Sequence, residues 1–568
     1  MRNTRKSQRK SNSNRCFCLA LAAVGAIVAL ALVCGLAYFL SVGMDSNIAT
    51  TAEPRSRPGV LRVAYSPEKA ELFTALVAEF NAQKLRTPDG DVVSVEAVEM
   101  DPDRMIQYAI EGRVDAVNPD SSIWLDQIDR ARMAQQQTET GLIGDTVRYA
   151  VSPVVIAAWE NVARSMGYPQ KRLGWQDVMA KAAADPNFKW SHPSTRSASG
   201  LLATLAMFYA GAGKTRGLTI EDATAEATLN YVSAIQKTVR QYGEGERAVI
   251  QQVIEQGRSY LDAFVVAEQL VIYYNTTSQK DKLVAIYPRE GTLWEDHPLA
   301  LLEKADLRPD QRLAFQEFRQ FVTSKTSQLQ VLKYGFRPTD LSISLSGASS
   351  PVTSLNGVDP AEPQTTLQIP GPAVVEVIRD VWWYTKRRTN VFLVADTSGS
   401  MAGEKIAGAR EAMAVFLSQI KSDQERVGLV TFSSQVNDVI PVAPLSANRT
   451  TLLNRIEQMS AGGDTALLDA VWEAYTRLQQ LNDRERINAI VAMTDGQENN
   501  SRIRLSDLVA RIKSSNERGV PVVIFCVAYG QDADYEVLGA LAKASGGQVR
   551  EGDLATIRDL YKVLSTYF

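Results

Sequence analysis

Oxygen-bearing side chains follow apolar or glycine-rich runs at three places in the C-terminal third of the chain. Asp396, Ser398 and Ser400 occupy alternate positions after VFLVA, Thr465 follows the turn GGD, and Asp495 follows AIVAMT. These five residues include no Cys or His, and carboxylate and hydroxyl oxygens are the ligands of hard cations. The set therefore predicts a site for Mg²⁺ or Mn²⁺. Because two carboxylates leave such an ion short of negative charge and of ligands, we expect it to bind an acidic residue of a partner protein.

Apolar strands and helical segments alternate from residue 390 to the end of the chain. Runs such as VFLVAD, RVGLVTF, INAIVAMT and PVVIFCVAY are almost wholly apolar, which is typical of parallel strands buried on both faces. We therefore predict an α/β fold with a doubly wound, mainly parallel sheet. Ligands of such sheets bind at the carboxyl ends of strands where the strand order reverses, and Asp396 is expected at that place.

The same segments resemble the von Willebrand factor A domain over residues 389–568. The motif parts DTSGS, GGDT and TDG occur in the order of that family's metal-ion-dependent adhesion site, so the sequence pattern of the site is complete. The resemblance implies a Rossmann-like domain in which the Ser398 and Ser400 hydroxyls bind the metal directly. It also implies that Asp396 and Asp495 bind it directly or through water, and that Thr465 engages when an external ligand binds. The alternative is that these residues only cap turns in a metal-free domain.

A second group of polar residues lies at predicted strand ends in the first half of the chain. Arg196, Ser197 and Ser199 belong to STRSASG, which precedes a long apolar helix. Free backbone N–H groups at a helix N-terminus, two hydroxyls and a guanidinium favour an anion or a carboxylate. Ser66 and Ser121 follow other predicted strands and are candidates for the same cleft. Helix capping and turn chemistry explain the serines equally well, so both interpretations stay open.

Residues 59–345 also alternate strands and helices, which predicts a second α/β region. The segments LRVAYSPEKAELFTALVAEFN, STRSASG, AIYPREGTLWEDHP and GFRP resemble, in kind and order, those of bacterial extracellular solute-binding proteins. The resemblance implies a two-lobed, periplasmic-binding-protein-like fold of type 2. It further implies that a small molecule, or an anionic solute in view of STRSASG, binds in the cleft between the lobes.

The N-terminus predicts a membrane anchor. A basic tail, 1–15, precedes the uncharged stretch 16–44, which is long enough to cross ~30 Å of hydrocarbon as a helix. The positive side is expected in the cytoplasm, so the bulk of the chain after a linker at 45–58 is expected to be extracytoplasmic. A cleaved signal is the alternative, although its apolar part is usually only ~7–15 residues long.

Composition argues against several classes of function. The net charge is −3 and the pI about 5.8, so no basic surface supports binding of nucleic acid. His192 and His297 are the only histidines, which are too few to favour a His-based zinc site or a catalytic triad. Both precede proline, so turn positions are expected for them. The phosphate-binding pattern G-x-x-x-x-G-K-[ST] does not occur. We therefore expect a binding protein and not an enzyme.

The two predicted domains are separated by a Ser-, Gly- and Pro-rich stretch, 346–364, and the amphipathic segment AVVEVIRDVWWYTKRR. We predict that 346–388 forms a linker and a docking helix. Two functions remain open for the whole chain. Either the A domain binds a protein through the metal, or the upstream domain is a solute receptor whose closure is relayed to the A domain or to a transporter.

Overall fold

The computed structural model describes residues 57–568 except 244, 279–280, 555 and 566–568. The predicted basic tail (1–15) and membrane span (16–44) lie outside the described residues, as does all but the end of the linker 45–58. Within the described part of the chain, no helix has the length and apolar character needed to cross a bilayer. Residues 58–568 form a single compact unit.

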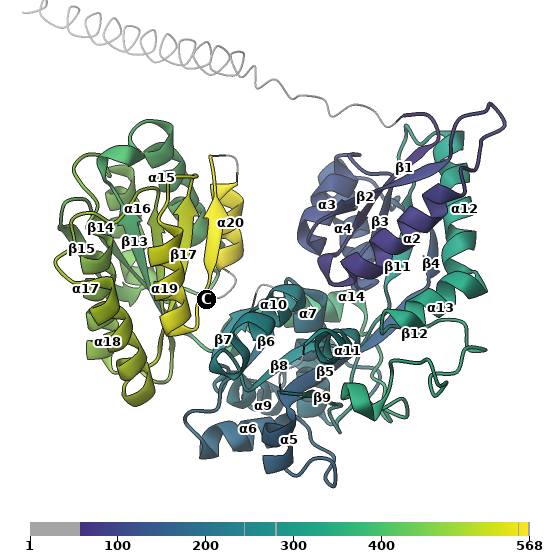
Figure 1. The fold of residues 1–568 in the computed structure, drawn as a ribbon, viewed down its shortest axis with the longest axis horizontal. Helices are drawn as coiled ribbons and strands as arrows, with labels where there is room; N and C mark the ends of the chain where they lie inside the picture. Colours follow the sequence, from purple (N-terminus) through teal and green to yellow (C-terminus); the bar gives the residue numbers. More distant parts are fainter. Residues whose placement is uncertain (1–56, 244, 279–280, 555, 566–568) are drawn as a thin grey trace, which may run out of the picture. The chain divides into compact units, whose positions relative to one another are not determined.

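The first lobe is built on a five-stranded sheet. Its strands, in spatial order, are β2 (Ser94–Glu99), β1 (Val60–Tyr65), β3 (Ala116–Asn118), β11 (Pro298–Leu302) and β4 (Ile143–Arg148). One face packs on α2 (Ala70–Ala82), α12 (Pro309–Thr323) and α13 (Lys325–Lys333), and the other on α3 (Pro102–Ile110) and α4 (Ile123–Gln136) (Figure 1). Leu61 and Val63 of β1 point to the first face and Ala64 to the second, as strand alternation requires.

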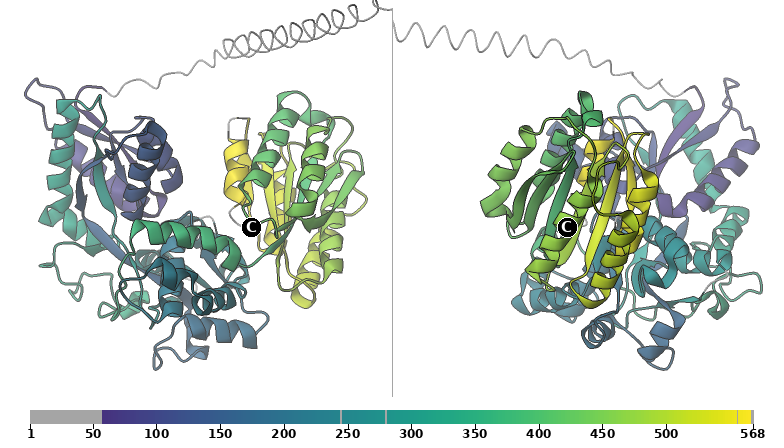
Figure 2. Two further views of the ribbon diagram at one scale, coloured as in Figure 1. Left: turned by 180° about the vertical axis from the view of Figure 1, so that it is seen from behind. Right: turned by 60° about the vertical axis from the view of Figure 1, so that its left-hand side comes forward.

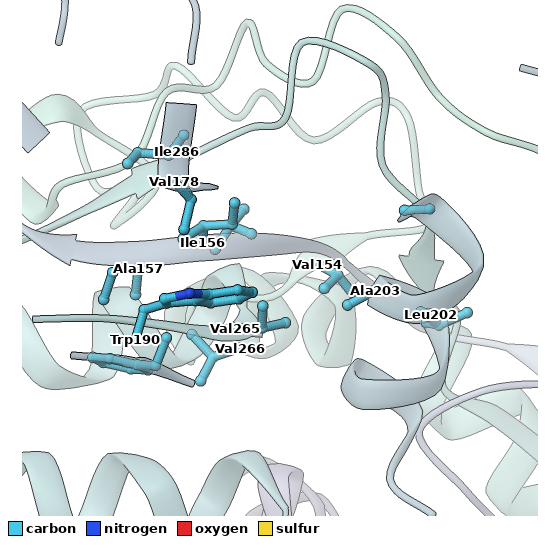
Figure 3. Close-up of a cluster of buried hydrophobic side chains, with 14 of the residues drawn as sticks. Val154, Ile156, Ala157, Val178, Trp190, Leu202, Ala203, Val265, Val266 and Ile286 are labelled. Carbon is cyan, nitrogen blue, oxygen red and sulfur yellow. The ribbon is translucent and has the colours of Figure 1, made fainter. Parts of the chain in front are cut away.

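The second lobe has its own sheet, whose main path runs β10 (Trp294–Glu295), β5 (Ala150–Trp159), β8 (Ala263–Ala267), β6 (Trp190–Pro193) and β7 (Gln241–Gly243). Strands β9 (Leu283–Ile286) and β12 (Arg337–Pro338) also pair with β5. Its helices are α5 (Glu160–Ser165), α6 (Trp175–Ala184), α7 (Ala198–Ala212), α8 (Ile220–Thr224), α9 (Glu226–Gln236), α10 (Glu246–Gln256) and α11 (Glu268–Thr277). Ile156, Trp190 and Val265 lie in the apolar core of this lobe (Figure 3).

The chain passes between the lobes at short connections. Only Tyr149 separates β4 from β5, and only Asp296 and His297 separate β10 from β11. Tyr149 and His297 are buried, and the Tyr149 hydroxyl donates a 2.9 Å hydrogen bond to Asn118 Oδ1 at the end of β3. The polar residues that follow β1, β3 and β10 therefore lie close to the connections between the lobes.

The segment predicted as a linker is an ordered strap on the second lobe. Val352, Val358 and Leu367 are buried, and the Leu367 N–H donates a 2.9 Å hydrogen bond to the Thr292 carbonyl. Its serines and prolines predicted a tether, but the isolated apolar residues between them fasten it to the lobe. The predicted docking helix forms as α14 (Pro372–Thr385) and buries one face, including Trp382, against α7, α8 and α9.

The C-terminal region is the predicted doubly wound α/β domain. Its sheet runs β15 (Val436–Pro444), β14 (Arg426–Phe432), β13 (Thr389–Asp396), β16 (Ile487–Thr494), β17 (Val522–Tyr529) and β18 (Val549–Gly552). All neighbours are parallel except β14 and β15. One face is covered by α15 (Glu404–Gln419), α16 (Leu445–Glu457) and α20 (Ile557–Leu564), and the other by α17 (Leu467–Leu481), α18 (Leu505–Arg518) and α19 (Tyr535–Ser545) (Figure 2).

Candidate functional site

The five metal-ligand candidates gather at the carboxyl ends of β13 and β16. Strand β13 lies between β14 and β16, so later strands are added on both sides of it and the strand order reverses there. Val391 and Leu393 pack toward one layer of helices, and Phe392 and Val394 toward the other. This two-sided burial fixes the strand and places Asp396, itself fully buried, at the switch point.

Hydrogen bonds connect four of the five side chains. Asp396 Oδ1 accepts a 2.7 Å bond from the Ser398 N–H, and the Ser398 and Ser400 hydroxyl oxygens are 3.0 Å apart. The Ser400 hydroxyl donates to Asp495 Oδ1 at 2.6 Å, and the Thr494 hydroxyl donates to Asp396 Oδ2 at 2.5 Å. Burial raises the pKa of Asp396 to about 6, since these hydrogen bonds offset only part of the desolvation of its charged form.

Thr465 reaches the same place from the loop before α17. A Cβ on Gly496 would lie 3.2 Å from Ser400 Oγ and 3.4 Å from Thr465 Oγ1, so glycine leaves the space between them free. The Gly399 N–H donates a 2.9 Å hydrogen bond to the Gly463 carbonyl, which joins the two loops. Thr465 N–H donates to Asn499 Oδ1 at 2.9 Å. The predicted residues therefore share one oxygen-rich site, of which Ser400 is the exposed member.

Lys405, on the first turn of α15, is a member of this site that the sequence analysis missed. Its ammonium lies 2.5 Å from Asp495 Oδ2 and so balances one of the two carboxylates. The lysine follows DTSGSMAGE within ten residues of Asp396, and that proximity in sequence was the available signal.

The donor set fits a hard divalent cation. Ser398, Ser400 and Thr465 would supply hydroxyl oxygens, and Asp396 and Asp495 would supply carboxylates. Among the described residues, no group of three His, Cys, Asp or Glu side chains is placed to hold a metal ion. A metal at this site would therefore depend on the hydroxyls, and Lys405 would have to leave Asp495 Oδ2 if that oxygen faced the ion.

A cavity of about 350 Å³ is lined by residues of both lobes of the first domain and by Arg550 of β18. Of the predicted solute ligands, Arg196 and Ser197 line this cavity, whereas Ser66, Ser121 and Ser199 are buried outside its lining. The Arg196 guanidinium forms an ion pair with Asp103. Ser197 is the N-cap of α7, since its hydroxyl accepts a 3.2 Å hydrogen bond from the Gly200 N–H.

The remaining serines have local structural contacts. The Ser66 hydroxyl donates to Glu68 Oε1 at 2.7 Å, and the Ser121 hydroxyl accepts a 3.4 Å bond from the Ile123 N–H. Ser199 Oγ is buried without a hydrogen-bond partner among the described residues. Capping and turn chemistry thus account for Ser121 and Ser197, as one of the two interpretations of the sequence allowed.

The sequence analysis did not predict the acidic residues that line this cavity. Glu68, Asp120 and Glu246 line it and are each at most 5% exposed. They stand in YSPEK, NPDSS and GEGER, just after strands β1, β3 and β7, so the signal was the same strand-end position that drew attention to the serines.

Comparison with known families agrees with the two folds. Residues 61–337 match the bacterial extracellular solute-binding protein family, and residues 390–562 match the von Willebrand factor type A domain. The chain joins a solute-binding domain to an A domain. The recognition of both families from their sequence motifs is thereby confirmed.

Two curated relatives each match 28% of this chain. Inter-alpha-trypsin inhibitor heavy chain H4 of Sus scrofa is 30% identical over 166 residues, which are 28% of this chain and 18% of the relative. The von Willebrand factor A domain-containing protein DDB_G0292016 of Dictyostelium discoideum is 31% identical over 160 residues, covering 28% of this chain and 16% of that protein. The chain thus spans less than a fifth of the length of these relatives.

One solved structure covers more than half of this chain. The periplasmic thiamin binding protein is 15% identical, covers 59% of this chain and 99% of its own, and superposes with a TM-score of 0.42. A likeness of this size concerns the fold alone.

Proposed function

We propose that this protein is a membrane-anchored, extracytoplasmic binding protein whose A domain binds an acidic side chain of a partner protein through Mg²⁺ or Mn²⁺. The supporting observation is the meeting of Asp396, Ser398, Ser400, Thr465 and Asp495 at one strand-end site. The basic tail and apolar stretch before residue 45 support the anchor.

The geometry favours binding over catalysis. Ser398 and Ser400 are bonded to each other, and Ser400 donates to a carboxylate, but no histidine occurs after His297 to act as a base for either hydroxyl. A cation on two carboxylates keeps part of its positive charge, which an incoming carboxylate would neutralise. Binding of a partner carboxylate to the ion requires no covalent bond to be broken.

A capture experiment tests the proposal. The purified, tagged chain is incubated with extracytoplasmic proteins of its source, once in Mg²⁺ and once in EDTA. The Asp495→Ala variant is incubated with the same proteins in Mg²⁺. The proposal expects a partner that is retained in Mg²⁺, released by EDTA, and not retained by the variant. Asp507→Ala, a carboxylate in the first turn of α18 and away from the site, is the matched control and should retain the partner. Partners indifferent to both EDTA and Asp495→Ala would refute metal-bridged binding.

A second function, solute reception, is favoured by the cavity of about 350 Å³ between the lobes. Small-molecule sites have volumes of roughly 300–1,000 Å³, so the cavity is large enough for a ligand. Helix α14 packs on the second lobe and ends at Thr385, and only three residues separate it from β13, which begins at Thr389. This short connection offers a path by which movement of the second lobe could reach the strand that ends in Asp396.

A further inference from the structure

Four carboxylates are buried where the two lobes of the solute-binding domain meet. Glu68 and Asp120 follow β1 and β3 of the first lobe, while Glu246 begins α10 and Glu295 ends β10 in the second. Their exposed fractions are 5%, 4%, 4% and 0%, respectively. Buried carboxylates without compensating charge are costly, so such a concentration requires an explanation.

Several of the carboxylate oxygens have no partner. Asp120 Oδ1, Glu246 Oε1 and both oxygens of Glu295 accept no well-formed hydrogen bond among the described residues, although the Trp124 indole lies beside Asp120 and Glu295 lies beside Glu246. Asp120 and Glu246 line the cavity, so a ligand there could supply the missing donors. Burial, followed by the nearby charge of Glu68, raises the pKa of both Asp120 and Glu246 to about 8. Ionising them without a positive charge nearby is therefore unfavourable.

The neighbouring basic groups do not balance these charges. Lys69 Nζ donates to the carbonyls of Asn118 and Pro119 at 3.0 and 2.6 Å and lies 3.5 Å from Glu68. His297 lies 3.9 Å from Glu68 and 3.7 Å from Glu295, but burial and the charge of Lys69 hold its pKa well below the usual value, so its ring is neutral. One buried lysine thus faces four carboxylates.

The arginines on the cavity wall are engaged with other acidic groups. Arg196 pairs with Asp103, and Arg247 forms a two-pronged ion pair with Glu71. Arg550 of β18 also lines the cavity, and its charge acts on Asp101. A backbone hydrogen bond from Ala198, at the start of α7, is made to Asp120. The helix N-terminus that the sequence predicted for an anionic solute is therefore opposite a carboxylate of the protein itself, which disfavours an anion there.

We infer that the cleft binds a small organic cation with protonated amino groups, held by Asp120 and Glu246. The inference rests on the solute-receptor function proposed above and specifies its ligand class. An ammonium group donates charge-assisted hydrogen bonds and supplies the positive charge that the unpartnered oxygens lack. The cavity of about 350 Å³ has room for such a molecule.

Calorimetry on the purified full chain tests this inference. The probes are 1,4-diaminobutane, spermidine and L-argininamide, with 1,4-butanediol, sodium sulfate and MgCl₂ as neutral, anionic and metallic counterparts. At least one amine is expected to bind, whereas the diol and sulfate are not. Asp120→Asn and Glu246→Gln should each weaken amine binding by about tenfold or more, because each removes a buried charge paired with the ligand.

Matched variants separate ligand binding from folding. Asp306→Asn alters a carboxylate that is 80% exposed and should bind the amine like the wild type. Without ligand, Asp120→Asn and Glu246→Gln should unfold near the wild-type temperature at pH 7, because a carboxyl group with a pKa of about 8 is mostly protonated there and is neutral like the amide. A normal melting temperature together with weakened amine binding would therefore show a loss of ligand contacts.

Different outcomes overturn different claims. Binding of sulfate or the diol without any amine would refute the cationic ligand while leaving the solute receptor standing. Binding of no amine, diol or sulfate would count against both the receptor and its ligand class. Amine binding unchanged by Asp120→Asn and Glu246→Gln would refute the assignment to this cleft. If Asp120→Asn abolished Mg²⁺ binding, the ligand of the cleft would be a metal ion and not an organic cation.

Discussion

The Ser400 hydroxyl donates a 2.6 Å hydrogen bond to Asp495 Oδ1 across 95 positions of sequence. Ser400 belongs to the turn after β13, and Asp495 directly follows β16. Since β13 and β16 are parallel neighbours, their carboxyl ends place the two side chains at one edge of the sheet. This relationship makes the metal-binding hypothesis testable with small changes in side-chain chemistry.

Removal of hydroxyl donors should weaken metal binding. Ser398→Ala combined with Ser400→Ala is expected to lower Mg²⁺ affinity by about tenfold or more, since the site has only two carboxylates to retain the ion. Isothermal titration calorimetry measures this change. Ser418→Ala, on the exposed side of α15 where the hydroxyl bonds the Val415 carbonyl, is the control and should leave the affinity unchanged. Equal affinities in the double variant and the control would contradict a role for the two hydroxyls.

Lys405 should oppose the metal. Lys405→Met removes a positive charge beside Asp495, so we expect Mg²⁺ affinity to rise by about fivefold, equivalent to roughly 1 kcal/mol, which is the energy of two unit charges about 4 Å apart in bulk water. In EDTA the same variant should melt at a lower temperature, because Asp495 is fully buried and loses its counter-charge. Lys421→Met, which removes an exposed pair with Asp380, serves as the control. A fall in Mg²⁺ affinity on Lys405→Met would show that the lysine supports the metal site.

Metal binding should depend on pH through Asp396. Burial raises its pKa to about 6, above the ordinary value of 3.8, so the metal-free folded state holds this proton more tightly than the unfolded chain. Its contribution to stability is therefore present below pH ~4 and is lost as pH rises through about 6. Mg²⁺ requires the ionised form, so affinity should be low at pH 5 and reach a plateau above pH ~7. Calorimetry at three pH values measures this, and a flat profile would show that Asp396 is ionised throughout.

The start of α7 should tolerate no side chain at Gly200. A Cβ there would approach the carbonyl oxygens of Ser194 and Pro193 to 2.2 and 2.3 Å, and backbone atoms cannot yield without moving β6. Gly200→Ala is expected to destabilise the first domain by about 3 kcal/mol. Gly539→Ala, in α19 with open space around it, should instead be neutral or stabilising by up to ~1 kcal/mol. Thermal unfolding of both variants tests the contrast, and equal melting temperatures would contradict the close packing of α7.

The sequence was most informative where local and long-range signals coincide. Apolar runs such as the one ending at Asp396 are buried on both faces, so they predicted the parallel sheet and the place of its ligand residues. The strap at 346–371 was not predicted, because its Ser and Pro content resembles a tether while its fastening depends on Val352, Val358 and Leu367 meeting another lobe. Isolated apolar residues have no periodicity from which such contacts could be predicted.

The charge of the cleft was harder to predict than its position. Strand-end serines indicated where a ligand could lie, but the acidic residues come from four separate segments. Nothing local in segments such as TLWED or GEGER shows that their carboxylates converge. Asp120 and Glu246 are 126 positions apart and become neighbours only when the lobes are assembled. Lys405 was missed for a different reason, because a lysine at the start of a helix is ordinarily solvated.

Direct detection of a bound metal tests the central claim most sharply. The purified chain, freed of metal with EDTA, is titrated with Mn²⁺ while electron paramagnetic resonance follows the free ion, in the wild type and in Asp495→Ala. The account predicts saturable binding that Mg²⁺ displaces in the wild type and that Asp495→Ala abolishes. Absence of saturable Mn²⁺ binding in the wild type, or full retention of it in Asp495→Ala, would contradict a metal-dependent binding site at the ends of β13 and β16.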